Sequence, residues 1–389
     1  MMKKFIYLVL AVLLLAACGG GSAVEEDTAE VLEPIILEET LPTPAEAPTE
    51  TPTEVPAESP IPPSTGRIFM YGEVHGVEAI LAHTLDIWGE FYHEYGMRHM
   101  FLEAPFFTGY WLNLWMQAED DTILYMLFEG WRGSAKYNPY QLDFYRRIKY
   151  DFPETIFHGV DVGHGSDHAG RRLLDYLIEN DLTDTAAYTL TRENIAQFSN
   201  FSRTRNHAMR SSVYMPYNFI REFDALGDQD IMMVAGAVHT YVGYFLGQEG
   251  VPTLVAVLYA RYGDQLHLFD LTRYGVPDIT PLATEMITVA GMAFEASYFG
   301  MIDLNFGDVV GQAFWRLEGA YDYFAQNPLG DDMLPFSNFP TRVEVGQVFV
   351  IDRHFADGGV ERLFYRTSGF YWRGMAAARE FLPEFLPGE

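Results

Sequence analysis

Short apolar runs alternate with longer stretches of helical spacing between residues 67 and 271, which we take as the main domain. In residues 77–95, for example, apolar side chains recur every three or four positions, and Gly96 follows as a stop signal. The runs that predict strands are residues 67–71, 98–102, 156–162, 231–235, 253–258 and 265–271. Because strands that alternate with helices form parallel sheets covered on both faces, the pattern predicts an α/β fold: a mostly parallel sheet flanked by helices.

The pattern is mixed in residues 272–389. Residues 286–299 and 309–324 combine apolar and small residues without a clear period. Residues 347–351 and 362–365 are expected to pair as a hairpin. We therefore expect an irregular C-terminal extension that packs on the main domain.

The first eighteen residues have the layout of a secretory signal. Lys3 and Lys4 precede an apolar run, residues 5–15, which is shorter than the roughly 20 residues that a membrane-spanning helix needs. The run leads into Leu-Ala-Ala-Cys18, which resembles a bacterial lipobox, so residues 1–18 are predicted to form a lipoprotein signal peptide with lipidation at Cys18. A plain signal peptide with an incidental cysteine is the alternative. The lipobox predicts an exported protein, lipid-anchored at the bacterial cell surface, whose contact with the membrane is through that anchor only.

Residues 19–66 have a different composition. Nine prolines fall between Pro34 and Pro63, and residues 24–65 contain eleven acidic residues but no Lys or Arg. Such a segment cannot bury enough apolar surface to offset chain entropy. We expect a disordered, acidic, Pro-rich stalk.

The chain as a whole is strongly acidic. It has 54 acidic and 25 basic residues, which give a formal net charge of −29 at pH 7. Since so acidic a surface repels phosphate backbones, the charge argues against a nucleic-acid partner. Cys18 is the one cysteine, so the fold has to be stable without disulfides.

Acidic residues and histidines follow four of the predicted strands. The carboxyl ends of parallel strands meet at one edge of the sheet, and ligands bind there. The residues at this edge are Glu73 and His75 after the first strand, Glu103 after the second, Asp161 and His164 after the third, and His239 after the fourth. A single histidine at a strand end is usually a hydrogen-bonded structural residue. Acids or histidines at the ends of four successive strands, however, favour a functional site.

The residue types suit the activation of water. A neutral imidazole takes a proton from water, and a neighbouring carboxylate fixes its tautomer. His75, Glu73, Glu103 and His239 are therefore the candidate catalytic residues. Glu73, His75 and His239 are also the ligand types of a zinc or similar divalent metal site.

Three further residues are candidates for binding the substrate. Asp161 and His164 lie at the same strand edge. Arg205 belongs to a predicted helix that would overhang the site, where a guanidinium would hold a carboxylate or carbonyl oxygen. The alternative for Arg205 is the neutralisation of nearby acids.

With these residues in view, the chain resembles the erythromycin esterase-like and ChaN-like haem-uptake group, to which the TIKI proteases are similar. The matching pieces are GEVHG at 72–76, the strand that ends in Glu103, GVDVG at 159–163, RNHAM at 205–209 and GAVHT at 236–240. The resemblance implies that His75 is a general base and that Glu73, Glu103 and His239 orient it or bind metal. Esterase-like sequences have an acidic residue where Asn206 stands, so no macrolide substrate is inferred.

The sequence therefore predicts a surface-anchored hydrolase in which a His/Glu site activates water on an ester or amide. The alternative is a haem- or metal-binding uptake lipoprotein without catalysis, with Tyr110, Trp111, Trp115 and Tyr125 lining a haem cleft. A degenerate scaffold is a third possibility. The corresponding partner is a small-molecule substrate or haem, and the corresponding cofactor is a divalent metal or haem.

Overall fold

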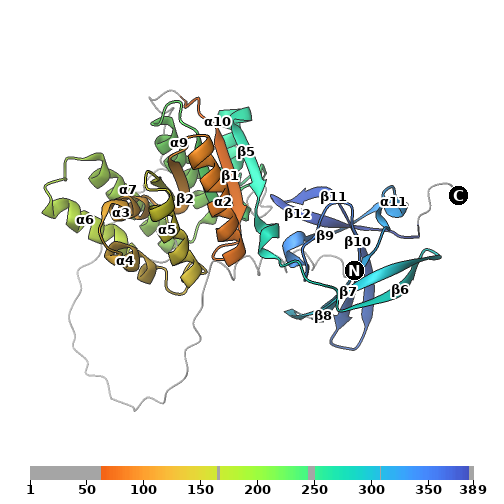
Figure 1. The fold of residues 1–389 in the computed structure, drawn as a ribbon. Helices are drawn as coiled ribbons and strands as arrows, with labels where there is room; N and C mark the ends of the chain where they lie inside the picture. The colour runs from red at the N-terminus through yellow and green to blue at the C-terminus, as the bar shows by residue number, and fades with distance from the viewer. Residues whose placement is uncertain (1–62, 164–166, 244–249, 307, 385–389) are drawn as a thin grey trace, which may run out of the picture.

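The computed structural model describes residues 63–163, 167–243, 250–306 and 308–384. The predicted signal peptide, the lipidation site and nearly all of the predicted stalk lie outside these residues, as does His164. Two lobes are visible, each built on its own β-sheet (Figure 1). Within the described ranges, no helix is long and apolar enough to cross a membrane.

The larger lobe contains a five-stranded parallel sheet in the order β3-β2-β4-β1-β5. Its strands are β1 (Ile68–Glu73), β2 (His99–Pro105), β3 (Ile156–Asp161), β4 (Ile231–Gly236) and β5 (Leu266–Asp270). Each coincides with a run that the sequence predicts as a strand, so the parallel α/β arrangement is confirmed. Because β4 inserts between β1 and β2, the polar residues that follow these three strands become neighbours.

Helices cover both faces of this sheet. They are α2 (Glu78–Glu94), α3 (Phe106–Gln117), α4 (Thr122–Gly130), α5 (Pro139–Asp151), α6 (His168–Glu179), α7 (Ala186–Thr204), α8 (His207–Met209), α9 (Met215–Asp224) and α10 (Leu254–Tyr262). Side chains alternate across each strand, so Tyr71 packs in the core with α2 to α6, whereas Met70 packs in the core with α9 and α10. The two hydrophobic cores explain why the strands are apolar on both sides.

One predicted strand is wrong. Residues 253–258 belong to α10, which buries Leu254, Leu258 and Tyr262 four residues apart on one helical face. The Thr253 side chain caps this helix by accepting a hydrogen bond from the Ala256 amide. A short run that is apolar throughout has no period to distinguish a strand from a buried helix, and only its continuation to Tyr262 reveals the helical spacing.

The smaller lobe is a seven-stranded antiparallel sheet in the order β6-β7-β8-β10-β11-β12-β9. Its elements are β6 (Ala283–Val289), β7 (Met292–Phe306), β8 (Val309–Leu317), α11 (Tyr321–Phe324), β9 (Leu329–Pro335), β10 (Val348–Phe355), β11 (Val360–Trp372) and β12 (Met375–Phe381). The expected hairpin is confirmed as β10 and β11. The irregularity predicted for this region is wrong, because breaks in register such as that between Tyr298 and Met301 interrupt the alternation of otherwise regular strands.

The two lobes are joined through β5 and the short helix η6 (Thr272–Gly275). The Asp270 carboxylate accepts hydrogen bonds from the Thr272 amide at 2.8 Å and, across the lobes, from the Ala376 amide at 2.8 Å. A Cβ on Gly374 would lie 3.3 Å from the carbonyl oxygen of Ala237, which shows how closely the lobes approach. A single carboxylate thus fixes the end of β5 to strand β12.

The chain joins the larger lobe at the amino edge of the parallel sheet. Ser64 is buried, and its hydroxyl donates to the carbonyl oxygen of Gly227 at 2.5 Å. Its amide donates to Asp224 Oδ1 at 3.0 Å, and its carbonyl accepts from the Gln265 side chain at 3.0 Å. These contacts lie before the first residues of β1, β4 and β5, so Ser64 is held at this edge.

A histidine pair lies between β2, β3 and α9, away from the carboxyl edge. His99 Nδ1 is 3.0 Å from His158 Nε2, and His158 Nδ1 is 3.3 Å from Glu222 Oε2. Burial, together with the neighbouring His158, lowers the pKa of His99 to about 4. His99 is therefore neutral at pH 7 in the folded protein.

This lowered pKa predicts acid-sensitive stability. Unfolding returns the pKa of His99 to 6.5, so the unfolded chain binds a proton that the folded chain refuses until about pH 4. Wild type should lose stability as the pH falls from 6.5 to about 4, and the His99→Gln variant should lose about 1–2 kcal/mol less over the same range. This figure is reduced because solvent partly screens the half-buried ring. Urea unfolding at pH 7 and pH 4.5 measures it. The exposed His93→Gln variant should follow wild type, and parallel curves for wild type and His99→Gln would contradict the assignment.

Candidate active site

The carboxyl edge of the parallel sheet brings together the predicted acids and histidines that the structure describes. Glu73, the last residue of β1, is level with Gly236, the last residue of β4. Glu103 on β2 reaches across the end of β4, where its Oε2 accepts from the Gly236 amide at 2.7 Å. A Cβ on Gly236 would lie 3.2 Å from His75 Nε2 and 3.3 Å from Glu103 Oε2. Glycine at this position therefore leaves room for the two side chains to meet.

His75 and Glu73 form a hydrogen-bonded dyad. The distance from His75 Nδ1 to Glu73 Oε1 is 2.7 Å. The other ring nitrogen, Nε2, lies 3.6 Å from Glu103 Oε2, beyond a direct hydrogen bond. The His75 side chain is 13% exposed, against 7% for Glu73 and 4% for Glu103. Solvent thus reaches the imidazole while the carboxylates are largely buried.

A buried arginine lies between two of the carboxylates. Arg210 Nη2 donates to Glu103 Oε1 at 2.7 Å and to Asp161 Oδ2 at 2.7 Å, and Arg210 Nε donates to Asp161 Oδ1 at 2.8 Å. The Arg210 side chain is 3% exposed. It belongs to the π-helical segment η2 (Arg210–Tyr214), which precedes α9. Such π-helical turns often occur at functional sites because the extra residue re-aims a side chain.

Electrostatics keep this arginine charged. Burial acts to lower the pKa of Arg210, but the charges of Asp161 and Glu103 and their hydrogen bonds outweigh it and raise the pKa above its ordinary value. The guanidinium is thus a permanent cation that compensates two buried anions. Asp161 is fixed further by its own backbone, because its Oδ1 accepts from the Val162 amide at 2.6 Å.

His239 differs from His75 in its partners. It lies in the short helix η3 (Ala237–His239) and is almost completely buried. Its Nε2 is 3.2 Å from Arg210 Nη1. Because a guanidinium only donates hydrogen bonds, this contact makes Nε2 of His239 the acceptor. Glu103 Oε1 also lies 3.4 Å from His239 Nε2, so His239 belongs to the buried network, whereas the His75 ring is bound to Glu73 and is partly exposed.

A loop from the α4–α5 connection packs over the same edge. Gly76 has a φ of +72°, and a Cβ there would lie 2.0 Å from the carbonyl oxygen of Ala135. The Asn138 side chain donates to the carbonyl oxygen of Gly76 at 3.2 Å, and the Lys136 ammonium donates to that of Glu103 at 3.1 Å. Glycine after His75 therefore allows the loop to bring a cation beside the carboxylates.

The residues present do not fit a metal centre. Across the described ranges, no three or more His, Cys, Asp or Glu side chains are arranged to hold a metal ion. Both oxygens of Glu103 already accept hydrogen bonds, from Arg210 and from the Gly236 amide, and the guanidinium supplies the positive charge. The metal site expected from Glu73, His75 and His239 has no support in this geometry.

The expected haem cleft has no support either. Trp111 and Trp115 are buried in the core, with indole N–H groups that donate to the Ala169 carbonyl oxygen and to Asp121 respectively. Tyr125, by contrast, is exposed, and its hydroxyl accepts from Arg146. These aromatic residues on α3 and α4 therefore stabilise the helical layer rather than line a common cleft.

Arg205 lies apart from this cluster. It is the left-handed C-cap of α7, with φ of +49°, and it is exposed. Asn206 caps α8, because its side-chain oxygen accepts from the Met209 amide at 2.9 Å. The arginine that contacts the carboxylates is Arg210, and the motif at 205–209 ends one residue before it.

Sequence analysis missed Arg210 and Lys136. Two carboxylates at strand ends covered by helices require a counter-charge, and this requirement is the signal for an arginine. Several arginines lie in the same stretch, and nothing in the sequence shows which one faces inward. For Lys136 no sequence signal exists, because its position depends on how the loop packs against Gly76.

Removing the central guanidinium should destabilise the protein strongly. Arg210→Met leaves Glu103 and Asp161 buried without their cation, and we expect a loss of about 3–5 kcal/mol in the free energy of unfolding. Arg205→Met, on the exposed C-cap nearby, should change it by less than about 0.5 kcal/mol. Urea denaturation of the two variants gives the comparison, and equal losses would refute the central role of Arg210.

Comparisons with known proteins do not assign a family. No protein-family model matches the chain, and no curated protein does. Among solved structures, a crystal structure of a protein from Bacillus cereus aligns with a TM-score of 0.41 and 11% identity, over 74% of this chain and 85% of that one. An erythromycin esterase variant in its open conformation aligns with a TM-score of 0.36 and 13% identity, over 57% of this chain and 72% of that one. Since both scores are low, the interpretation of the site depends on its own geometry.

Proposed function

We propose that this protein is a hydrolase of small esters or amides, in which His75 activates the attacking water. The observation that carries the proposal is the His75–Glu73 dyad at the carboxyl edge of the sheet. Its carboxylate is buried and its imidazole is reached by solvent, which is the arrangement that a general base requires.

The chemistry follows from the hydrogen bonds of the ring. Glu73 accepts a hydrogen bond from the Nδ1–H group of His75, so the lone pair on Nε2 is available to a water molecule. As the water attacks a carbonyl carbon, its proton passes to Nε2, and the Glu73 carboxylate stabilises the imidazolium that forms. The tetrahedral intermediate then collapses as the ester C–O or amide C–N bond breaks, and the imidazolium gives its proton to the leaving alcohol or amine. The 3.6 Å separation between Nε2 and Glu103 Oε2 allows one water to contact both groups.

Arg210 acts in this scheme as a positioning residue. It fixes Oε1 of Glu103, and the Gly236 amide fixes Oε2, so the carboxylate is held beside the imidazole. Fixed dipoles and charges of this kind need no reorganisation during the reaction. Lys136 supplies a second cation at the same strand end, suited to the negative charge that develops on a carbonyl oxygen.

The location of the activity is part of the proposal. The lipobox at Cys18 and the acidic stalk support export and lipid anchoring at the bacterial cell surface. The substrate would then be a small molecule outside the cytoplasm, and contact with the membrane would be confined to the lipid.

His75→Ala should abolish hydrolysis without unfolding the protein. We expect wild type to cleave at least one member of a panel of nitrophenyl esters and anilides, and the variant to be slower by about 100-fold or more, since a general base contributes at least that factor. Absorbance of released nitrophenol or nitroaniline measures the rate, and circular dichroism checks the fold.

The exposed His93→Ala variant is the matched control and should keep the wild-type rate. The proposal fails if wild type and His75→Ala are equally inert across the panel, or equally active.

A further inference from the structure

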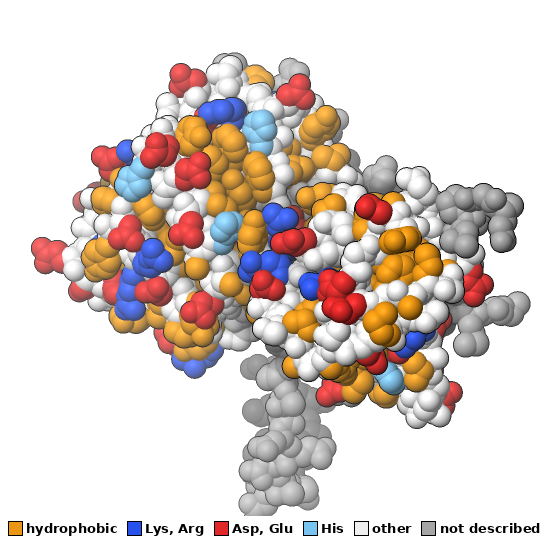
Figure 2. All heavy atoms as spheres, turned by 45° about the vertical axis from the view of Figure 1, so that its right-hand side comes forward, with side chains coloured by type: hydrophobic (Ala, Val, Ile, Leu, Met, Phe, Trp, Pro, Cys, Tyr) orange, Lys and Arg blue, Asp and Glu red, His pale blue; other side chains and the backbone are white. Residues whose placement is uncertain are grey.

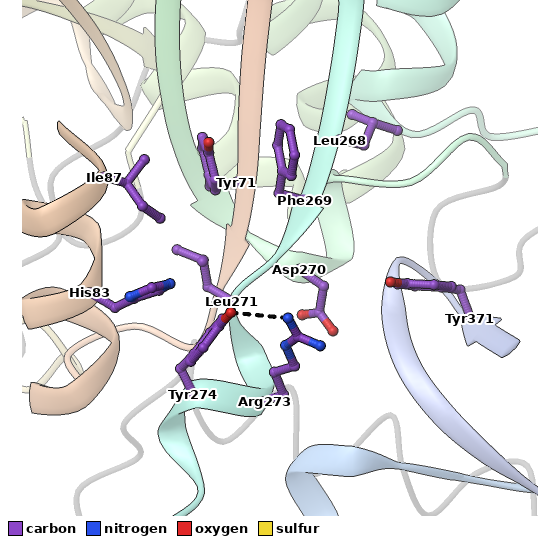
Figure 3. A pocket seen from close by; sticks show the side chains of 10 residues that line it. All are labelled: Tyr71, His83, Ile87, Leu268, Phe269, Asp270, Leu271, Arg273, Tyr274 and Tyr371. Carbon is purple, nitrogen blue, oxygen red and sulfur yellow. Dashed lines mark hydrogen bonds between the residues drawn. The ribbon is translucent and has the colours of Figure 1, made fainter. Parts of the chain in front are cut away.

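A second hollow lies at the junction of the two lobes, away from the carboxylate cluster. Its volume is about 280 Å³, and it opens between α2, β5, η6 and the end of β11 (Figure 3). None of Glu73, His75, Glu103, Arg210 or His239 lines it. It is therefore a site separate from the one assigned to hydrolysis.

Aromatic rings from both lobes line this hollow. Tyr71 and Phe269 stack with their ring centroids 4.7 Å apart, and Phe269 remains 43% exposed. Tyr371, from the smaller lobe, is 58% exposed and lies on the opposite side in Figure 3. Phe269 and Tyr371 thus leave much of their aromatic surface open to contact with a ligand.

One end of the hollow carries a guanidinium. The Arg273 guanidinium lies over the Tyr274 ring at 4.9 Å and donates to its hydroxyl at 3.0 Å. The Tyr274 ring also packs against His83, with centroids 4.0 Å apart. Burial lowers the pKa of His83, the charge of Asp86 raises it, and the charges of Arg273 and Arg342 lower it, so charges of both signs lie near this ring.

The arginines at this end have no carboxylate of their own. Within the described ranges, neither Arg273 nor Arg342 forms an ion pair, although the chain has a net charge of −29. Asp270 lines the hollow, but its two oxygens accept hydrogen bonds from the Thr272 and Ala376 amides. Space-filling Figure 2 shows Lys and Arg side chains interspersed with Asp and Glu side chains where the lobes meet, beside a band of hydrophobic side chains.

The opposite end has the other sign. Glu90 is close enough to Tyr71 to contribute, after burial, to the raised pKa of its phenol. Glu90 and His83 are seven residues apart on α2, so the two ends are separated by about 10 Å. Asp86 and Asp270 bring negative charge to the Arg273 end as well, so the group there that can hold an anion is the guanidinium itself.

We propose that this hollow binds a small cyclic carboxylate, with its ring between Phe269 and Tyr371 and its carboxylate on Arg273. The flat, open aromatic faces match a ring, and the planar guanidinium matches a carboxylate. The volume is just below the range of about 300–1,000 Å³ that is usual for drug-sized ligands, so it suits one substituted ring. An aromatic acid and a sugar acid share this chemistry.

Calorimetric titration of the full-length protein with benzoate and with glucuronate tests the proposal. At least one should bind with a Kd of millimolar or below, and Arg273→Gln should weaken that binding about tenfold or more. Binding of benzoate alone identifies an aromatic acid, and binding of glucuronate alone identifies a sugar acid. Benzyl alcohol, which has the ring without the charge, should bind more weakly than benzoate and be insensitive to Arg273→Gln.

Arg192→Gln is the matched control, because Arg192 is also an exposed arginine over a tyrosine ring, that of Tyr188, but on α7. It should bind as wild type does. The bound carboxylate should also raise the pKa of His83, which NMR titration of its ring detects. The proposal is overturned if neither acid binds at millimolar concentration, or if Arg273→Gln and Arg192→Gln bind alike.

Discussion

A guanidinium buried between two carboxylates holds the carboxyl edge of this sheet together. Arg210 joins Glu103 on β2 to Asp161 on β3, while Glu103 also binds the end of β4. Three strands therefore end on one connected set of charges. Burying these charges separately would be very costly, and the network is tolerable only because every member has a partner of opposite charge or a hydrogen-bond donor. The arrangement makes the edge rigid. A site that positions its reacting groups to within a few tenths of an ångström requires such rigidity.

The two histidines of this edge share Glu103 as a neighbour but differ in their hydrogen-bond partners. His239 accepts from Arg210 inside the buried network, so its ring stabilises the cation. His75 donates to Glu73, and its ring is partly exposed to solvent. Strand order explains the difference, because β1 delivers His75 beside the covering loop, whereas His239 follows β4 into the interior. A residue type alone thus does not define a role; the identity of each hydrogen-bond partner does.

Much of this architecture is visible in the sequence, and the failures have physical causes. Alternating runs predict the parallel sheet, and the acids and histidines after each run predict which edge is functional. Residues 253–258 were misassigned because a short apolar run has no diagnostic period. The smaller sheet was missed because register breaks hide its alternation. Arg210 could not be selected over Arg205, since the turn that aims it inward is a property of the packed helix rather than of local sequence.

The buried position of Ser64 has a consequence for how substitutions there would act. Ser64 is fixed at the edge of the sheet where the strands begin, whereas His75 lies beyond the edge where they end. A six-residue strand separates these edges by about 20 Å. A substitution at Ser64 would therefore act on the stability of the larger lobe, and not through contact with a group bound at the imidazole.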